Sequence, residues 1–121
     1  MKVWFQHADF SDQVYELDLA STMGKYEDVD WSAELALEQD LARKGEENCP
    51  PGLGIVYADD TILHICPNPS GALVHLHFPD KAMGLFRRQR SMTLENVPAE
   101  QVRRCIRAFF EQRWDVIKGI A

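Results

Sequence analysis

Residues 49–78 read CPPGLGIVYADDTILHICPNPSGALVHLHF, and the rest of the chain is arranged around this stretch. It contains three apolar runs, Leu53–Ala58, Thr61–Cys66 and Ala72–Phe78. The segments between them, Asp59-Asp60 and residues 67–71, are rich in the residue types that form turns. We therefore predict three consecutive antiparallel strands joined by short turns.

The segments on either side add strands to this arrangement. Residues 79–81 predict another turn, and residues 83–94 predict a fourth strand with a bulge or bend at Gly84. Lys2–Gln6 predicts a short strand near the N-terminus because it is rich in β-branched and aromatic residues.

Residues 14–29 are harder to interpret. Residues 14–19 alternate apolar and acidic side chains, as a half-buried strand does, although Phe10, Val14 and Leu17 also fit the spacing of a short helix. We interpret residues 14–19 as a strand and residues 20–29 as a loop.

Two helices complete the prediction. Asp30 can cap a helix that runs from Trp31 to about Lys44 and ends at Gly45. Pro98 suits the first turn of a second helix, which an apolar stripe extends to about Lys118. We expect one α+β domain over residues 1–121. It would contain a four-stranded antiparallel meander flanked by the two helices, with an extra N-terminal strand or hairpin.

Composition narrows the classes of function. The net charge is −6, with 4 basic and 12 acidic residues in positions 1–50 and 9 basic and 7 acidic residues in positions 51–121. An acidic chain argues against general nucleic-acid binding, which requires clustered positive charge.

No apolar run is long enough to span a membrane, and the N-terminus lacks the pattern of a secretory signal. The three cysteines favour reduced thiols, so we expect a cytoplasmic protein.

Arginine and tryptophan side chains are the first candidates for a binding surface, because both residue types are enriched at protein interfaces. Arg103 and Arg107 are neighbours on the last helix, and Trp114 follows on the same side, where a guanidinium can lie over the indole. Trp31 and Arg88 complete the set of predicted contact residues.

The histidines are the second candidate. His75 and His77 point to one face of a strand, and His64 lies on the neighbouring strand. If Cys66 pairs with Gly71, His64 shares that face; if the turn is one residue longer, His64 points to the other face. Converging imidazoles with the Cys66 thiolate would make a zinc site.

No catalytic signature accompanies these residues. Cys66 with a histidine supplies the residue types of a nucleophile and base, without the motifs that fix their geometry. The sequence therefore predicts a small cytoplasmic protein that binds a protein partner or forms a homo-oligomer such as a dimer. It is not expected to be an enzyme or to need a cofactor. The alternative is a domain that binds a metal or small ligand through His64, His75, His77 and Cys66.

Overall fold

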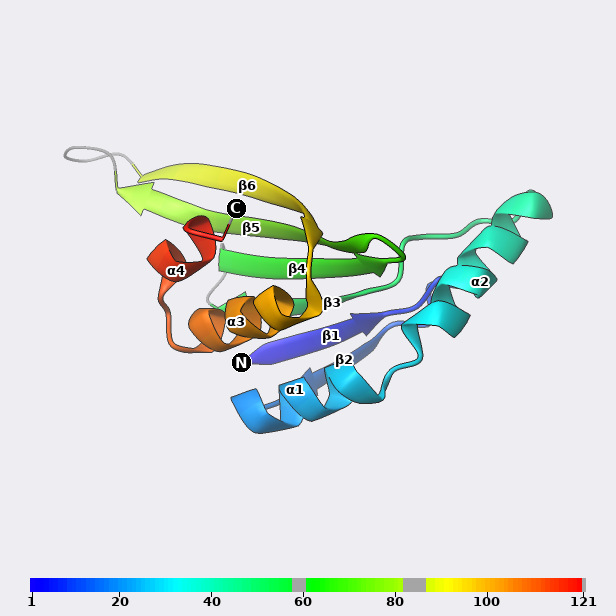
Figure 1. The fold of residues 1–121 in the computed structure, drawn as a ribbon, viewed down its shortest axis with the longest axis horizontal. Coiled ribbons are helices and arrows are strands. Elements are labelled where there is room, and N and C mark those ends of the chain that lie inside the picture. The colour runs from blue at the N-terminus through cyan, green and yellow to red at the C-terminus, as the bar shows by residue number, and fades with distance from the viewer. Residues whose placement is uncertain (58–60, 82–86, 121) are drawn as a thin grey trace.

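The computed structural model describes residues 1–57, 61–81 and 87–120, and for residues 79–81 and 87–90 it describes the backbone alone. The described residues form an α+β structure with a six-stranded antiparallel sheet and four helices (Figure 1). The strands are β1 (Lys2–Gln6), β2 (Gln13–Glu16), β3 (Gly52–Tyr57), β4 (Thr61–Asn68), β5 (Gly71–Lys81) and β6 (Arg87–Val97). The helices are α1 (Leu19–Asp28), α2 (Trp31–Arg43), α3 (Ala99–Phe110) and α4 (Trp114–Lys118).

The sheet order is β2-β1-β3-β4-β5-β6, and every neighbouring pair is antiparallel. The predicted meander is present as β3 to β6, which pair in sequence order. The extra N-terminal segment is the β1–β2 hairpin, which joins the same sheet through β1 and β3, so the sheet has six strands and extends beyond the predicted four-stranded meander. The class and the antiparallel character of the sheet are confirmed.

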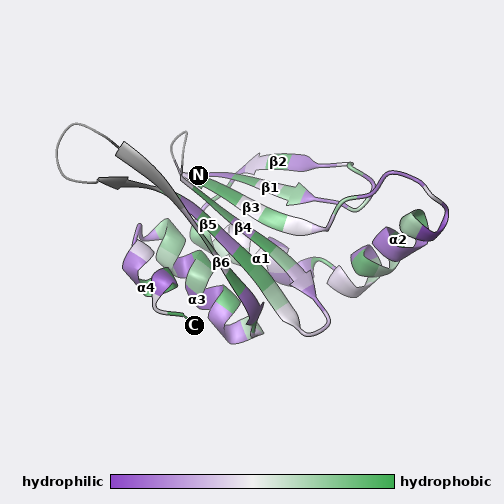
Figure 2. Ribbon diagram, turned by 90° about the horizontal axis from the view of Figure 1, so that it is seen from above, coloured by the Kyte–Doolittle hydropathy of each residue, from purple (hydrophilic) through white to green (hydrophobic). Residues whose placement is uncertain are grey.

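One face of the sheet carries the core. Figures 1 and 2 show α1, α3 and α4 on this face, whereas α2 lies at one end of the sheet. The strands bury alternate residues there, such as Val3, Leu53, Leu63 and Val74. Helix α3 adds an apolar stripe that includes Phe109, which is fully buried. We call the opposite face of the sheet the open face.

The structure corrects the interpretation of residues 14–29. Strand β2 ends at Glu16, and residues 20–29, predicted as a loop, belong mainly to α1. The Asp18 side chain caps this helix by accepting a hydrogen bond from the Ser21 amide at 2.8 Å. This cap was overlooked because the apolar and acidic alternation before it continues the strand pattern.

The C-terminal helix also differs from its prediction. A single helix to Lys118 was expected, but the chain breaks after Phe110, where Gln112 adopts a positive φ of 58°, and resumes as α4. Helix α2 begins and ends almost as predicted, with the Asp30 side chain accepting a hydrogen bond from the Ala33 amide.

The β5–β6 region differs from its prediction as well. Residues 79–81 continue β5 instead of forming a turn, and the fourth strand, β6, extends to Val97. The expected turn at Asp59-Asp60 and the bend at Gly84 lie outside the described residues. Within the described residues, no helix has the length and the hydropathy that a membrane-spanning segment requires.

Candidate functional site

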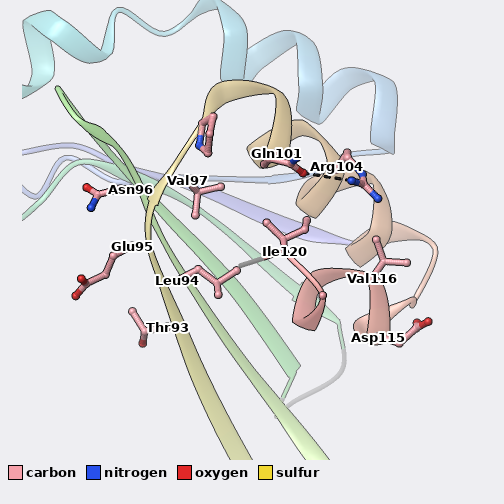
Figure 3. A pocket seen from close by; sticks show the side chains of 12 residues that line it. Thr93, Leu94, Glu95, Asn96, Val97, Gln101, Arg104, Asp115, Val116 and Ile120 are labelled. Carbon is pink, nitrogen blue, oxygen red and sulfur yellow. Dashed lines mark hydrogen bonds between the residues drawn. The ribbon is translucent and has the colours of Figure 1, made fainter.

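A groove of about 700 Å³ lies between the C-terminal half of β6 and the helices α3 and α4 (Figure 3). We call it the β6–α3–α4 groove. Its lining combines apolar side chains, among them Leu94, Val97, Val116 and Ile120, with polar ones. The polar side chains are those of Thr93, Asn96, Gln101 and Arg104 and the carboxylates of Glu95 and Asp115. Ligand-binding grooves in proteins likewise combine apolar walls with polar groups that fix orientation.

Three exposed arginines lie at one end of this groove, two on α3 and one in the connection between α3 and α4. Arg104, Arg107 and Arg113 surround a smaller hollow of about 190 Å³, which shares Arg104 and Val116 with the groove. We call these three residues the arginine cluster. None of them forms an ion pair with any described residue, although Arg103 and Arg43 do. Arg104 donates a hydrogen bond of 3.4 Å to the Gln101 side chain at the groove rim.

The sequence of α3 explains how this surface forms. Val102, Ile106 and Phe109 pack on the sheet, so the residues between them, including Arg104 and Arg107, point outward. The break after Phe110 then turns the chain back, and α4 places Val116 beside α3. The apolar side chains and the exposed guanidinium groups therefore share one continuous surface.

Arg103 and Trp114 have other contacts than those predicted. Arg103 lies toward α1, where its guanidinium pairs with the Glu27 carboxylate at 3.4 Å. Trp114 lies on α4 rather than on the same helix as the arginines, and its ring packs against Phe109 and Tyr57, with ring centroids 5.0 and 6.0 Å apart. The expected guanidinium–indole stack is therefore not among the ring contacts of the described residues.

Trp31 and Arg88 are remote from the groove lining. The Trp31 indole donates a hydrogen bond of 2.9 Å to the Tyr26 backbone oxygen and packs on the Tyr26 ring, which joins α2 to α1. Arg88 lies in β6 opposite Asp80 by backbone register, and its side chain lies outside the described residues.

The three central histidines share the open face. The β4–β5 turn is shorter than either register considered from sequence, because Asn68 pairs with Gly71 and His64 pairs directly with His75. The His75 and His77 rings are held by hydrogen bonds of 2.9 and 2.8 Å to the Thr93 and Ser91 side chains of β6.

This arrangement does not form a ready metal centre. Within the described residues, no three His, Cys, Asp or Glu side chains are placed to hold one ion. The Cys66 sulfur lies 3.7 Å from the His64 ring nitrogen. Burial, followed by the nearby Glu38 charge, raises the pKa of the Cys66 thiol to about 11. A thiol that stays protonated at neutral pH is a poor nucleophile and a poor metal ligand.

Sequence reasoning identified Arg107 but missed Arg104 and Arg113. Arg104 could have been found from the apolar stripe of α3, because it falls between buried positions. Arg113 depends on the break at Gln112, for which the segment Glu111-Gln112-Arg113 carries no glycine or proline signal.

Comparisons with known proteins add no relative. No family model matches the sequence, no curated protein matches it, and no solved structure matches the fold.

Proposed function

We propose that this chain is a protein-binding module that holds a partner segment bearing apolar and acidic side chains in the β6–α3–α4 groove. One observation carries the proposal: an apolar groove of about 700 Å³ adjoins three arginines that have no carboxylate partner among the described residues.

The charge distribution supports an acidic partner. The chain carries a net charge of −6, yet the arginine cluster surrounds a hollow whose lining includes a single carboxylate, Glu111. The adjoining groove adds Glu95 and Asp115, so an acidic side chain of the partner is expected at the arginine end of this surface. Guanidinium groups bind carboxylates with paired, directional hydrogen bonds, and Arg is enriched where interfaces are strongest. An acidic side chain beside an apolar one would satisfy both parts of this surface.

The groove favours anchoring by side chains over the addition of a strand. β6 is an edge strand, and such edges can pair with an extended peptide. A bulge interrupts its register between Ala72 and Val74, however, and Asn96 adopts a positive φ of 55° where the strand passes the groove. Such a bulge bends the edge away from regular pairing.

Metal binding at His64, His75, His77 and Cys66 stays the second proposal, supported by the shared face of these residues. Elemental analysis of the purified protein tests it. A stoichiometric transition metal would support it, whereas absence of metal together with no thermal shift on adding Zn²⁺ would count against it.

The three thiols are free, which supports the expected cytoplasmic location.

Selection from a phage-displayed library of random peptides tests the partner proposal. We expect the enriched peptides to combine apolar residues with Asp or Glu. Their affinity should fall at least about tenfold for the double variant Arg104→Glu/Arg107→Glu.

The control is Arg43→Glu/Lys44→Glu, which changes the net charge equally on the exposed end of α2. Enriched peptides without acidic residues, or peptides that bind both variants equally, would contradict the proposal.

A further inference from the structure

The open face of the sheet has no covering layer among the described residues. The strand side chains that are fully buried all point to the helix-covered face. On the open face, only Gly52 and Gly54 are buried, and every described side chain there is at least partly exposed. None of the described helices lies over it (Figures 1 and 2).

The centre of the open face carries no charged side chain in its described part. Its apolar members lie on β1, β3, β4 and β5: Trp4, Val56, Ile62 and Leu73. Among the side chains of this face that the structure describes, the charged ones are Lys2, Glu16 and Glu95, and they stand at its margin. Protein interfaces typically have few charged residues and more aromatic residues at their centre, and this face has both features.

A row of directly paired residues crosses the whole face. Val14, Trp4, Gly54, His64, His75 and Thr93 are successive register partners from β2 to β6.

The rings in the middle of this row are held in place by their neighbours. The Trp4 indole lies over Gly54, in the space that a Cβ atom would fill. It also packs against the His64 ring, with centroids 5.7 Å apart and an interplanar angle of 31°. The hydrogen bond between the His75 ring and the Thr93 hydroxyl fixes the next ring. A surface already held in place loses little side-chain entropy on association.

We propose that a second copy of this chain covers the open face, with the two sheets packed face to face about a two-fold axis. A two-fold interface requires a surface that complements itself. A face without described charged side chains at its centre meets this requirement, because no like charges oppose each other there. The arginine cluster does not meet it, since two copies of that cluster would repel.

The size of the face predicts a dimer of modest affinity. Six strands about 4.8 Å apart, with about five residues of about 3.3 Å each, give a footprint of roughly 450 Å² per copy. Interfaces of this size fall in the weak, transient class. Val14, at 64% exposure the most exposed large apolar side chain of this face, would lose contact with water on dimerisation.

Sedimentation velocity between about 5 and about 500 μM tests the proposal, a range that covers micromolar dissociation constants. We expect the mass to rise from that of one chain toward that of two, and Val14→Lys/Leu73→Lys to remain a monomer throughout. Ala36→Lys/Ala42→Lys, which adds the same two charges at exposed positions of α2, should associate like the wild type. Circular dichroism of each variant establishes that it is folded.

If Val14→Lys/Leu73→Lys fails to fold, Val14→Lys alone serves, because it alters an edge-strand side chain that is already largely in water. A wild type that is monomeric over the whole range would overturn the proposal. So would association that survives these changes. Binding of the selected peptides to Val14→Lys is expected to be unchanged, so failure of this proposal is distinguishable from failure of the peptide-binding function.

Discussion

At the residue scale, one glycine shapes the middle of the open face. A Cβ atom at Gly54 would overlap the Trp4 indole, whereas a Cβ atom at Gly24 would meet nothing within 4 Å. The missing side chain on β3 therefore gives the tryptophan on β1 its place against His64. The position of the Trp4 indole on this face therefore depends on the absence of a side chain at Gly54.

We predict that Gly54→Ala lowers the free energy of unfolding by about 1–3 kcal/mol, because the indole must leave a filled position. Urea unfolding measures this change. Gly24→Ala, in helix α1, is the control, and it should be neutral or stabilising because alanine favours the helix. Equal effects of the two substitutions would contradict the packing described here.

His64 provides a second prediction at this scale. Burial, followed by the neighbouring His75, holds the pKa of His64 below its ordinary value of 6.5, while Asp12 opposes this shift. Trp4 and the Cys66 thiol also face the ring. The unfolded chain therefore takes up the proton more readily than the folded chain, so stability is lost as the pH falls from 6.5 through the folded-state pKa.

We predict that the wild type loses more unfolding free energy than His64→Gln when the pH is lowered from about 7.5 to about 5.5. Urea unfolding at both pH values gives the two differences. The variant carries the same carboxylates, so it controls for their titration. Identical losses in the two proteins would show that His64 is not desolvated as described.

At the element scale, α1 shows how a capping side chain establishes a helix that periodicity does not reveal. The residues of α1 lack a clear apolar period, and only Thr22 among them is fully buried. Asp18 nevertheless starts the helix by capping the Ser21 amide, and this hydrogen bond lowers the pKa of the Asp18 carboxyl.

We predict that Asp18→Ala costs about 1 kcal/mol of stability and that Asp18→Asn costs much less, since asparagine also caps. Thermal unfolding of both variants tests this. Asp28→Ala removes the same group from the other end of α1, where a negative charge has no favourable dipole interaction. A loss from Asp28→Ala as large as that from Asp18→Ala would contradict the capping role.

Elements with strong local signals were predictable, and those decided by tertiary contacts were not. Strands β1, β3 and β4 and helix α2 follow from apolar runs, turn residues and caps. Strand β5 was predicted to end at a turn containing Pro79, yet it continues because β6 pairs with it as far as Lys81.

The proposed binding surface also has parts that local sequence signals predict and parts that depend on tertiary contacts. Arg107 was predictable from the composition and spacing of α3. The groove was not, because it exists only where α4 turns back toward β6. The shared face of the histidines depended on a turn length that sequence left open, and the pairing of Asn68 with Gly71 decides it.

At the scale of the whole molecule, the fold separates two surfaces with opposite character. The centre of the open face lacks charged side chains among the described residues, and the β6–α3–α4 groove lies among helices on the other face of the sheet with its arginine cluster. We propose that the first surface serves self-association and that the second holds an acidic partner.

Salt should therefore act on the two interactions differently. We predict that raising NaCl from about 0.05 to about 0.5 M weakens peptide binding at the arginine cluster, because exposed charges are screened. Self-association through the open face should be maintained or strengthened, since it depends on apolar burial. Fluorescence anisotropy with a selected peptide and sedimentation of the free protein measure the two effects. A parallel response of both to salt would argue against two separate surfaces.

Hydrogen–deuterium exchange of the protein with and without a selected acidic peptide tests the partner site most directly. We expect added protection in peptides that cover Thr93–Val97 and Arg104–Val116, with little change in the strands β1 and β3. Protection confined to the open-face strands, or absent from α3 and α4, would contradict the assignment of the groove as the binding site.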